Sequence, residues 1–260
     1  MIIIPVTSVN DIIDIREFLA QYRGRHITFI PNDGNAGDHL IAYATLQIFD
    51  ELGLDYSIGS LGEFDGSLLF YGGGGNLVGH YGNCRDFLYK NKDNNEIVIL
   101  PHTIREEDWL VSWLGENVTI ICRERKSYDY VCRMRRAGTT LLAHDMAFYT
   151  RVSESLNPEG ILNAFRTDME STNVIRPPDN IDISETLRSW VWTKEAIDKT
   201  GTAFLERIAK HETINTNRLH VAIAGMVIGR QVHLYRNTYW KNKEVYDFSM
   251  ADNPNVRWAE

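Results

Sequence analysis

The chain has 260 residues, which is enough for one large domain or two modest ones at about 100–200 residues per domain. Its composition, 43% hydrophobic and 24% charged, is that of a globular protein and excludes disordered, collagen-like and coiled-coil chains. The 27 Lys and Arg residues against 35 Asp and Glu give a net charge of −8, which disfavours nucleic-acid and anionic-membrane binders because both need a basic footprint. A phosphate-bearing ligand would therefore need a local basic site.

Cysteine content and hydropathy bear on the cellular compartment. Cys84, Cys122 and Cys132 form no CxxC pair, which indicates reduced thiols and neither a disulfide framework nor a zinc site. The N-terminus lacks the basic and long apolar regions of a signal peptide. The longest uncharged apolar stretch, 221–229, is far shorter than the roughly 18–20 residues that span a bilayer. We expect a cytoplasmic protein without a membrane span, which leaves room for peripheral contact with the inner membrane face.

Short apolar runs alternate with longer amphipathic stretches along the chain. Before residue 150 they predict strands at 26–30, 67–71, 96–100, 118–122 and 139–143, and helices at 39–52, 85–92, 105–114 and 123–138, the last with Gly138 as its C-cap. After a polar stretch at 151–158 they predict strands at 160–165, 212–215 and 231–235, and helices at 193–210, 217–229 and 239–248. The segment 171–191 shows no interpretable pattern. This alternation indicates α/β architecture with parallel sheets, in two halves at 1–155 and 156–260.

Glycine-rich and charged clusters follow the predicted strands almost without exception. They lie at 31–38, 72–76, 101–103, 123–125, 144–145, 166–168 and 236–243. In open parallel sheets, ligands bind outside the carboxyl ends of the strands. We therefore expect these clusters to converge on one crevice between the two halves.

The two glycine-bearing loops allow two interpretations each. Asp38 could cap the helix that follows the loop at 31–38, or serve as a catalytic carboxylate, while Gly34 and Gly37 would let the backbone approach a ligand. The run 72–75 lacks the spacing of a dinucleotide fingerprint and an acidic residue about 20 positions further on. Because four glycines are costly in backbone entropy, we expect a loop that approaches a ligand, with a purely structural turn as the alternative.

Single histidines and arginines after strands are ambiguous in the same way. His102 and His144 could each be a histidine that merely bonds a neighbouring loop. Arg123 and Arg125 could be surface ion-pair residues, although two cations at a helix N-terminus oppose the helix dipole.

The clearest local signal is TNRLH at 216–220, which opens an apolar helix. Thr216 or Asn217 can cap this helix, and its first N–H groups then form an anion site. Arg218 and His220 would add a bidentate donor and a titratable group at the same end. An anionic ligand would remove the conflict between these cations and the helix dipole, with a plain surface turn as the alternative.

Taken together, these segments resemble the polysaccharide pyruvyl transferase family. The matching pieces are NDGNAGDHLI, YGGGGNL, LPHT, the arginine after the fourth strand, AHDMAF, FRTD and NRLHVAIAGMVIGRQVHLYRNTYWKN, in the family's order from about residue 30 to 247. The resemblance implies two Rossmann-like domains facing a central cleft, as in B-type glycosyltransferases. It also implies phosphoenolpyruvate as the donor and a sugar diol as the acceptor, giving a pyruvate ketal.

The resemblance also suggests roles for individual residues, with donor binding in the C-terminal half and acceptor binding in the N-terminal half. His220 would be the acid or phosphate partner and Asp38 the base or acceptor-orienting carboxylate, with the assignment of acid and base open. Donor binding is expected from Arg218, Arg166, Leu219 and Asn217, and acceptor or loop contacts from Asn35, Gly37, Gly74, Asn76, His102 and Lys241. No resident cofactor, metal or nucleic acid is expected. The partners are phosphoenolpyruvate and a saccharide, lipid-linked or otherwise.

Two other classes of protein stay open at this point. A nucleotide-sugar-dependent glycosyltransferase would share the two-domain crevice and the anion site. A non-catalytic homologue that only binds could retain many of the same residues, although the crowd of charged side chains at one sheet edge counts against it.

Overall fold

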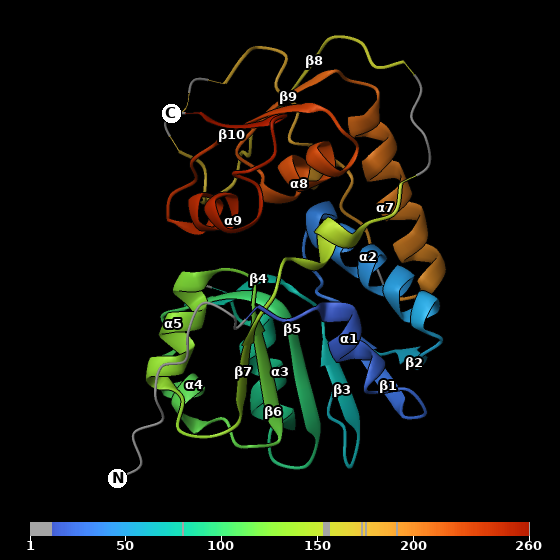
Figure 1. Cartoon of the computed structure of the whole chain (residues 1–260), viewed down its shortest axis with the longest axis vertical. Coiled ribbons are helices and arrows are strands. Elements are labelled where there is room, and N and C mark those ends of the chain that lie inside the picture. Colours follow the sequence, from blue (N-terminus) through green and yellow to red (C-terminus); the bar gives the residue numbers. More distant parts are fainter. Residues whose placement is uncertain are drawn as a thin grey trace.

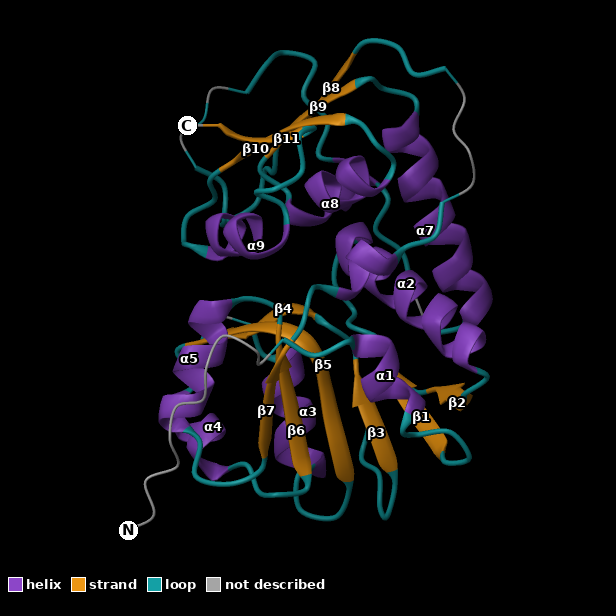
Figure 2. Ribbon diagram, viewed as in Figure 1, coloured by secondary structure: helices purple, strands orange, loops and turns teal. Residues whose placement is uncertain are grey.

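Two parallel β-sheets form the framework of the molecule (Figures 1 and 2). The computed structural model describes residues 12–79, 81–152, 157–172, 174, 176–190 and 192–259. Within these residues every pair of named strands is parallel. The predicted α/β class with parallel sheets is confirmed. The division near residue 155 stays a prediction, since 153–156 lie outside the described residues.

The larger sheet has seven strands in the part of the chain that the structure describes. They are β1 (His26–Ile30), β2 (Asp55–Ile58), β3 (Leu68–Tyr71), β4 (Gly74–Val78), β5 (Glu96–Arg105), β6 (Val118–Cys122) and β7 (Thr139–Leu142). Their order is β2-β1-β3-β5-β6-β7, with β4 also pairing with β5. The accompanying helices are α1 (Ile15–Ala20), α2 (Ala36–Leu52), α3 (Asn83–Asn91), α4 (Asp108–Trp113), α5 (Arg125–Met134) and the 3-10 helix η1 (Met146–Tyr149).

The smaller sheet follows later in the chain and has four strands in the order β11-β10-β9-β8. They are β8 (Ile161–Ala164), β9 (Thr213–Thr216), β10 (Gln231–Tyr235) and β11 (Val256–Ala259). Its helices are α6 (Ile183–Thr186), α7 (Lys194–Ala209), α8 (Leu219–Val227) and α9 (Lys241–Ser249). Figure 2 shows α8 and α9 between the small sheet and the upper edge of the large one.

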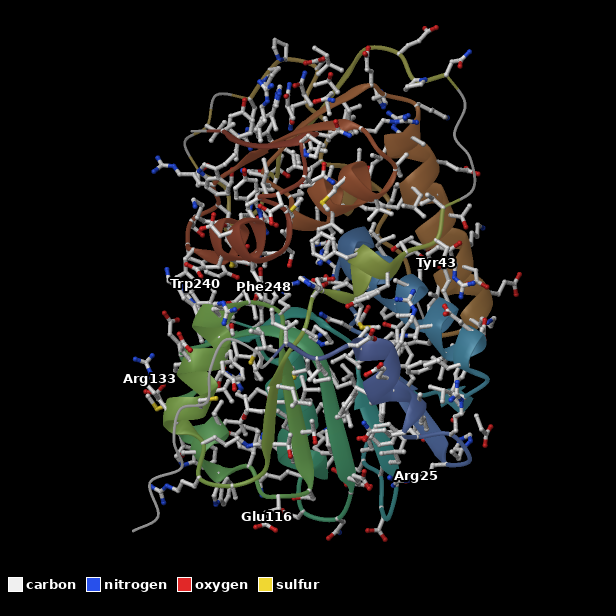
Figure 3. All side chains as sticks on the ribbon, viewed as in Figure 1. Arg25, Tyr43, Glu116, Arg133, Trp240 and Phe248 are labelled. Atoms are coloured by element: carbon white, nitrogen blue, oxygen red, sulfur yellow. The ribbon has the colours of Figure 1, made fainter. Side chains whose placement is uncertain are left out.

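Helix α2 joins the two sheets. It packs against α7, α8 and η1, and Figure 1 shows it running alongside α7. Tyr43, which is labelled on α2 in Figure 3, lies against Gly201 of α7. One apolar core cluster accordingly contains Phe29 of the large sheet together with Ile214 of the small one. The two sheets therefore share a core along one side of the molecule.

A second connection lies on the opposite side, between α5 and α9. The guanidinium of Arg125 lies over the ring of Phe248, and Lys126 pairs with Glu244 at 2.9 Å. Figure 3 shows Trp240, just before α9, and Phe248 of α9 beside the upper, N-terminal end of α5. The two sheets are thus held together on both flanks of the space between them.

Three of the predictions about local structure are wrong. The residues 101–103 do not form a loop but continue β5, because β4 supplies a further partner strand there. Part of the glycine run 72–76, predicted as a loop, belongs to strand β4, which begins at Gly74. The helix predicted to end at Gly138 already ends at Met134, and Gly138 takes its positive φ of 84° in the turn before β7.

Cys84 and Cys122 are free and buried, whereas Cys132 is exposed. Among the helices that the structure describes, none combines the length and the apolar character needed to cross a membrane.

Candidate functional site

A pocket of about 430 Å³ lies where the carboxyl ends of strands from both sheets meet. Its walls come from strand β4, from the segments after β1, β4, β6, β8 and β9, from α6 and from the start of α9. Among the predicted site residues, those that line it are Asn35, Asp38, Asn76, Arg166, Arg218, Leu219, His220 and Lys241. Five of the seven polar clusters therefore converge as expected, whereas 101–103 and 144–145 contribute no residue to the pocket lining. Gly37, Gly74, His102 and Asn217 do not line this pocket.

The start of α2 forms one wall of the pocket. Asn35 is the N-cap: its side chain accepts from the Gly37 N–H at 2.9 Å, and Asp38 Oδ2 accepts from the Asn35 N–H at 3.1 Å. The other oxygen of Asp38 accepts from Asn32 Nδ2 at 3.2 Å. Asp38 is thus the third residue of a capping box and not the cap itself, and it still presents its half-buried carboxylate to the pocket.

The glycine run after β3 is required by close contacts with the protein itself. A Cβ on Gly72 would lie 2.8 Å from the backbone nitrogen of Asn32, and one on Gly73 would lie 2.8 Å from the Pro101 carbonyl oxygen. Gly74 has φ of 139°, which side chains rarely adopt, and Gly75 lies against the guanidinium of Arg123. Packing alone thus accounts for Gly72, Gly73 and Gly74, whereas Gly75 also lines the pocket.

His102 supports the pocket wall from behind. Its Nε2 lies 2.9 Å from Asn76 Oδ1 and 3.2 Å from the Asn76 backbone nitrogen, and Asn76 Nδ2 donates to Asn32 Oδ1 at 2.7 Å and to Tyr71 Oη at 3.0 Å. Burial, together with the charge of Arg123, lowers the pKa of His102 to about 3. A neutral His102 therefore fixes Asn76, which does face the pocket.

His220 lies at the centre of an ion cluster that joins the two sheets. Its Nε2 is 3.3 Å from Asp145 Oδ2 and 3.3 Å from Arg123 NH1. Arg123 also donates to Asp145 Oδ2 at 2.7 Å and to Thr103 Oγ1 at 2.8 Å. Although burial alone would raise it, the charges of His220 and Arg123 hold the pKa of Asp145 well below its usual range. Asp145 is therefore an ionised partner that orients the His220 ring.

The other side of the His220 ring packs against the start of α2. A Cβ on Gly37 would come within 2.7 Å of His220 Nδ1, so this glycine allows the imidazole to lie where it does. By contrast, His144 bonds Ser249 Oγ at 2.8 Å and packs near Phe248, away from this pocket. Arg123 is fully buried, which rules out the surface ion-pair interpretation, whereas Arg125 is exposed.

The N-terminus of α8 opens onto the pocket beside His220. Arg218 is its N-cap, and no described side chain caps the first turn. Thr216 Oγ1 instead accepts from the Arg218 N–H at 2.9 Å, and Asn217 Oδ1 accepts from the Arg166 N–H at 2.8 Å. The expected cap by Thr216 or Asn217 is therefore wrong, because both side chains are engaged outside the helix. The uncapped N–H groups and the helix dipole favour an anion at this end.

The two arginines expected to hold the donor are bound to carboxylates. Arg166 donates from Nε and NH2 to Asp168 at 2.7 and 2.9 Å, and from NH1 to Glu170. Arg218 donates from Nε and NH2 to Asp182 at 2.9 and 2.6 Å, and its NH1 lies 3.0 Å from Asp168. Glu185 also contacts Arg218 at 3.3 Å. Both guanidinium groups are thus held rigidly at the pocket wall.

Lys241 is a buried lysine that reaches the pocket from the start of α9. Its Nζ donates to Glu170 Oε2 at 2.7 Å and lies 5.0 Å from the centre of the Tyr239 ring. Burial lowers the pKa of Lys241 to about 8, although the charge of Glu170 acts in the opposite direction. Lys241 therefore places an ammonium group with a lowered pKa near Arg166 and Arg123.

Several residues of the site were not singled out from the sequence. Asp145 and Asp168 follow strands and stand within the clusters 144–145 and 166–168, so their position was a usable signal. Helix α6 lies in the segment 171–191 that shows no pattern, yet it contributes Ser184 and Glu185 to the pocket, and Arg188 shortly after it also lines the pocket. No periodicity could have revealed a helix of four residues.

Comparison with known proteins gives the family and the fold of the chain. The sequence profile described as "Polysaccharide pyruvyl transferase" matches residues 35–239, which is well over half of the chain. The chain belongs to the polysaccharide pyruvyl transferase family. It is 22% identical over 279 residues to a Bacillus subtilis (strain 168) protein named "Putative pyruvyl transferase EpsO", an alignment that covers 87% of this chain and 85% of that protein.

A solved structure with the same fold comes from Klebsiella pneumoniae subsp. pneumoniae NTUH-K2044. It is the crystal structure of the functionally uncharacterized protein KP1_0663, which superposes with a TM-score of 0.81 at 29% identity. The match covers 95% of this chain and 97% of that chain. The α/β fold described above is therefore one that a related chain also adopts along almost its whole length.

Proposed function

We propose that this chain transfers the pyruvyl group of phosphoenolpyruvate to two hydroxyls of a sugar, forming a pyruvate ketal and releasing phosphate. Family membership supports the transferase class and a polysaccharide context. The observation that carries the proposal is the pairing of His220 with buried Asp145 beside the uncapped N-terminus of α8. We also propose that the halves around the two sheets act as facing domains of the B-type glycosyltransferase kind.

The α8 N-terminus and the basic side chains around it suit a donor that carries phosphate and carboxylate groups. Backbone N–H groups and a helix dipole bind phosphate, and guanidinium groups bind carboxylates bidentately. Arg123, Arg218 and Lys241 surround this end of the pocket. The proposed donor would therefore bind against His220, and the proposed chemistry uses no resident metal or cofactor.

Ketal formation needs a proton for the methylene carbon of the donor. Protonation of that carbon leaves the central carbon electrophilic, and a sugar hydroxyl adds to it and loses its proton to a base. Loss of phosphate and attack by the second hydroxyl complete the ketal. His220 is the proposed acid, because Asp145 orients its ring and offers an anionic partner to the imidazolium.

Asp38 is the proposed acceptor-side carboxylate. Both of its oxygens already accept hydrogen bonds, from Asn35 and Asn32, so its position is fixed before the sugar arrives. Asn76 lies on the same wall and is held by His102. These groups would bind and deprotonate the attacking hydroxyl of a saccharide, whether that saccharide is free or lipid-linked.

The function is tested by incubating the chain with phosphoenolpyruvate and a panel of galactosyl, mannosyl and N-acetylhexosaminyl acceptors. We expect phosphate release together with a product heavier than the acceptor by pyruvate minus water. A product that instead gains a sugar unit, with protection by a nucleoside diphosphate and none by phosphoenolpyruvate, would contradict the proposal and favour a glycosyltransferase.

A further inference from the structure

One carboxylate, that of Asp168, joins both arginines of the site. Its two oxygens accept from Nε and NH2 of Arg166 at 2.7 and 2.9 Å. Its Oδ2 also lies 3.0 Å from NH1 of Arg218, which comes from a different strand and helix. A carboxylate shared by two guanidinium groups has the charge and the bidentate geometry that an anionic substrate group would have in the same place.

The other carboxylates hold the arginines from the protein side. The Asp182 side chain binds Arg218 through two atoms and is only 6% exposed, and Glu170, which binds Arg166, is only 3% exposed. The Asp168 side chain is 29% exposed and lines the pocket. Removal of Asp168 would therefore leave both arginines in position with donors facing the pocket.

The carboxylates around these arginines already balance the positive charge of the cluster. Four cations already meet four carboxylates in this cluster: Arg166, Arg188, Arg218 and Lys241 against Asp168, Glu170, Asp182 and Glu185. An incoming phosphate or carboxylate group would add like charge at close range, which is unfavourable. The entry of an anion next to Arg166 and Arg218 therefore requires one carboxylate to withdraw.

Asp168 is the carboxylate best placed to withdraw. It lies after β8, in a stretch that belongs to no helix or strand, and Met169 beside it is 74% exposed. A rotation of the Asp168 side chain breaks its hydrogen bonds to the arginines and the one from the Glu170 N–H at 3.1 Å. It breaks no backbone hydrogen bond of a sheet or helix. Asp182 and Glu170, being buried, have no comparable freedom.

We propose that Asp168 is an internal competitor for the donor, holding the position between Arg166 and Arg218 that an anionic group of the donor takes when it binds. This inference rests on the proposed function. It means that Asp168 sets the affinity and the selectivity of the site for anions. A ligand must carry a group that binds both arginines better than the Asp168 carboxylate does. Asp168, Arg166 and Arg218 thus form a clamp, and ligands that are neutral or that bind only one arginine do not displace Asp168 from it.

The test compares binding of two probes, inorganic phosphate and phosphoenolpyruvate, to the full chain by calorimetry. Asp168→Asn keeps the shape of the side chain and removes the competing charge. If the clamp is open in a tenth of the molecules or fewer, this variant should bind about tenfold or more tightly, because a site that is competent only part of the time has its affinity reduced by that fraction. Asp179→Asn, which removes an exposed carboxylate outside the pocket, should bind as the unaltered chain does.

Asp182→Asn should act in the opposite direction to Asp168→Asn. It removes the bidentate support of Arg218, so we expect weaker binding of both probes. Equal or weaker binding by Asp168→Asn would overturn the competitor role, even if ketal formation by the unaltered chain confirms the proposed function. Tighter phosphate binding by Asp168→Asn, together with no ketal formation by the unaltered chain, would support the competitor role of Asp168 and contradict the proposed function.

A measurement on the unaltered chain covers the case in which Asp168→Asn does not fold. Carboxylates are labelled with a carbodiimide and an amine, with and without saturating inorganic sulfate, an anion that does not react with the reagent. Displacement predicts faster labelling of Asp168 in the presence of sulfate and unchanged labelling of Asp182. Unchanged or slower labelling of Asp168 would overturn the proposal.

Discussion

His220 has a different neighbour at each ring nitrogen, and these neighbours decide what its replacement should do. Nε2 faces Asp145 and Arg123, and Nδ1 faces Gly37. His220→Gln keeps a polar side chain but cannot deliver a proton, so we expect single-turnover ketal formation to fall by a factor of about 100–10,000 at saturating donor. The measurement is the single-turnover rate alongside donor affinity. An equal loss in rate and affinity would mean that His220 only holds phosphate.

Asp145 and His144 provide the comparison for this variant. Asp145→Asn removes the charge that orients His220, so the rate should fall while donor affinity changes less. His144→Gln alters a histidine next to Asp145 that bonds Ser249 outside the pocket, and it should leave the rate nearly normal. A large loss in His144→Gln would contradict the assignment of His220 as the histidine of the site.

His102 should make the stability of the fold depend on pH. Its pKa is about 3 in the folded chain against an ordinary 6.5, mainly because burial disfavours the charged ring. Between these values the unfolded chain takes up a proton that the folded chain refuses, so the free energy of unfolding falls as pH falls below 6.5. Relative to His102→Gln, the unaltered chain should lose about 2 kcal/mol between pH 7 and pH 5. Urea unfolding at each pH measures this difference, and a constant difference would contradict the prediction.

At the scale of elements, the contact between α2 and α7 depends on one glycine. A Cβ on Gly201 would lie 2.7 Å from Cβ of Tyr43, at the root of a side chain that cannot swing away there. Alanine is about 1 kcal/mol better than glycine within a helix, but overpacking at a rigid contact costs about 1–3 kcal/mol. We expect Gly201→Ala to be destabilising, as measured by the free energy of unfolding in urea.

Two further variants check that the loss comes from this contact. Gly62→Ala adds a methyl group whose nearest neighbour would be 3.8 Å away, so it should change stability little. Combining Gly201→Ala with Tyr43→Gly removes the clashing Cβ and ring, and the double variant should be more stable than the sum of the single changes implies. Additive losses would show that Tyr43 is not the cause.

The elements that could be predicted from the sequence are those whose apolar runs carry their own signal. The bounds of β1, β6 and β10 match the prediction, because each is a short run of mostly apolar or β-branched residues between polar ones. Strand β4 could not be predicted, since glycines carry no side-chain pattern and it forms by pairing with β5. Helix α6 follows Asp182, whose carboxylate bonds Arg218, a contact that only the folded chain creates.

The location of the candidate site could be predicted from the sequence, but the ion-pair partners of its charged residues could not. The carboxyl ends of parallel strands meet at one edge, and this is why Asp38, Arg166 and His220 were expected together. The partner of each charge depends on distances between residues far apart in sequence, such as the 75 positions between Asp145 and His220. No spacing rule links such residues, so the Asp145 pair and the Asp168 clamp emerge only from the fold.

At the scale of the whole molecule, the two sheets are joined through a shared core and through α5 and α9, and the pocket lies between these contacts. A ligand in that pocket touches residues from both sheets at once, including Asp38 and His220. It binds only when the whole arrangement is intact. Ligand binding should therefore stabilise the chain as one unit and not one half alone.

Because the pocket contacts both sheets, donor binding should raise the melting temperature of the whole chain. A ligand that binds only the folded chain stabilises it by about 2.7 kcal/mol at 100 times its Kd, so phosphoenolpyruvate should raise the melting temperature of the single transition by several degrees. Arg218→Ala should abolish this increment, because it removes the guanidinium at the start of α8. Arg218→Ala will itself melt earlier, since it leaves Asp182 buried without its partner, so the quantity to compare is the increment within each variant. Arg257→Ala, at an exposed position of β11, should keep the full increment. An increment that survives in Arg218→Ala would mean that the donor binds elsewhere.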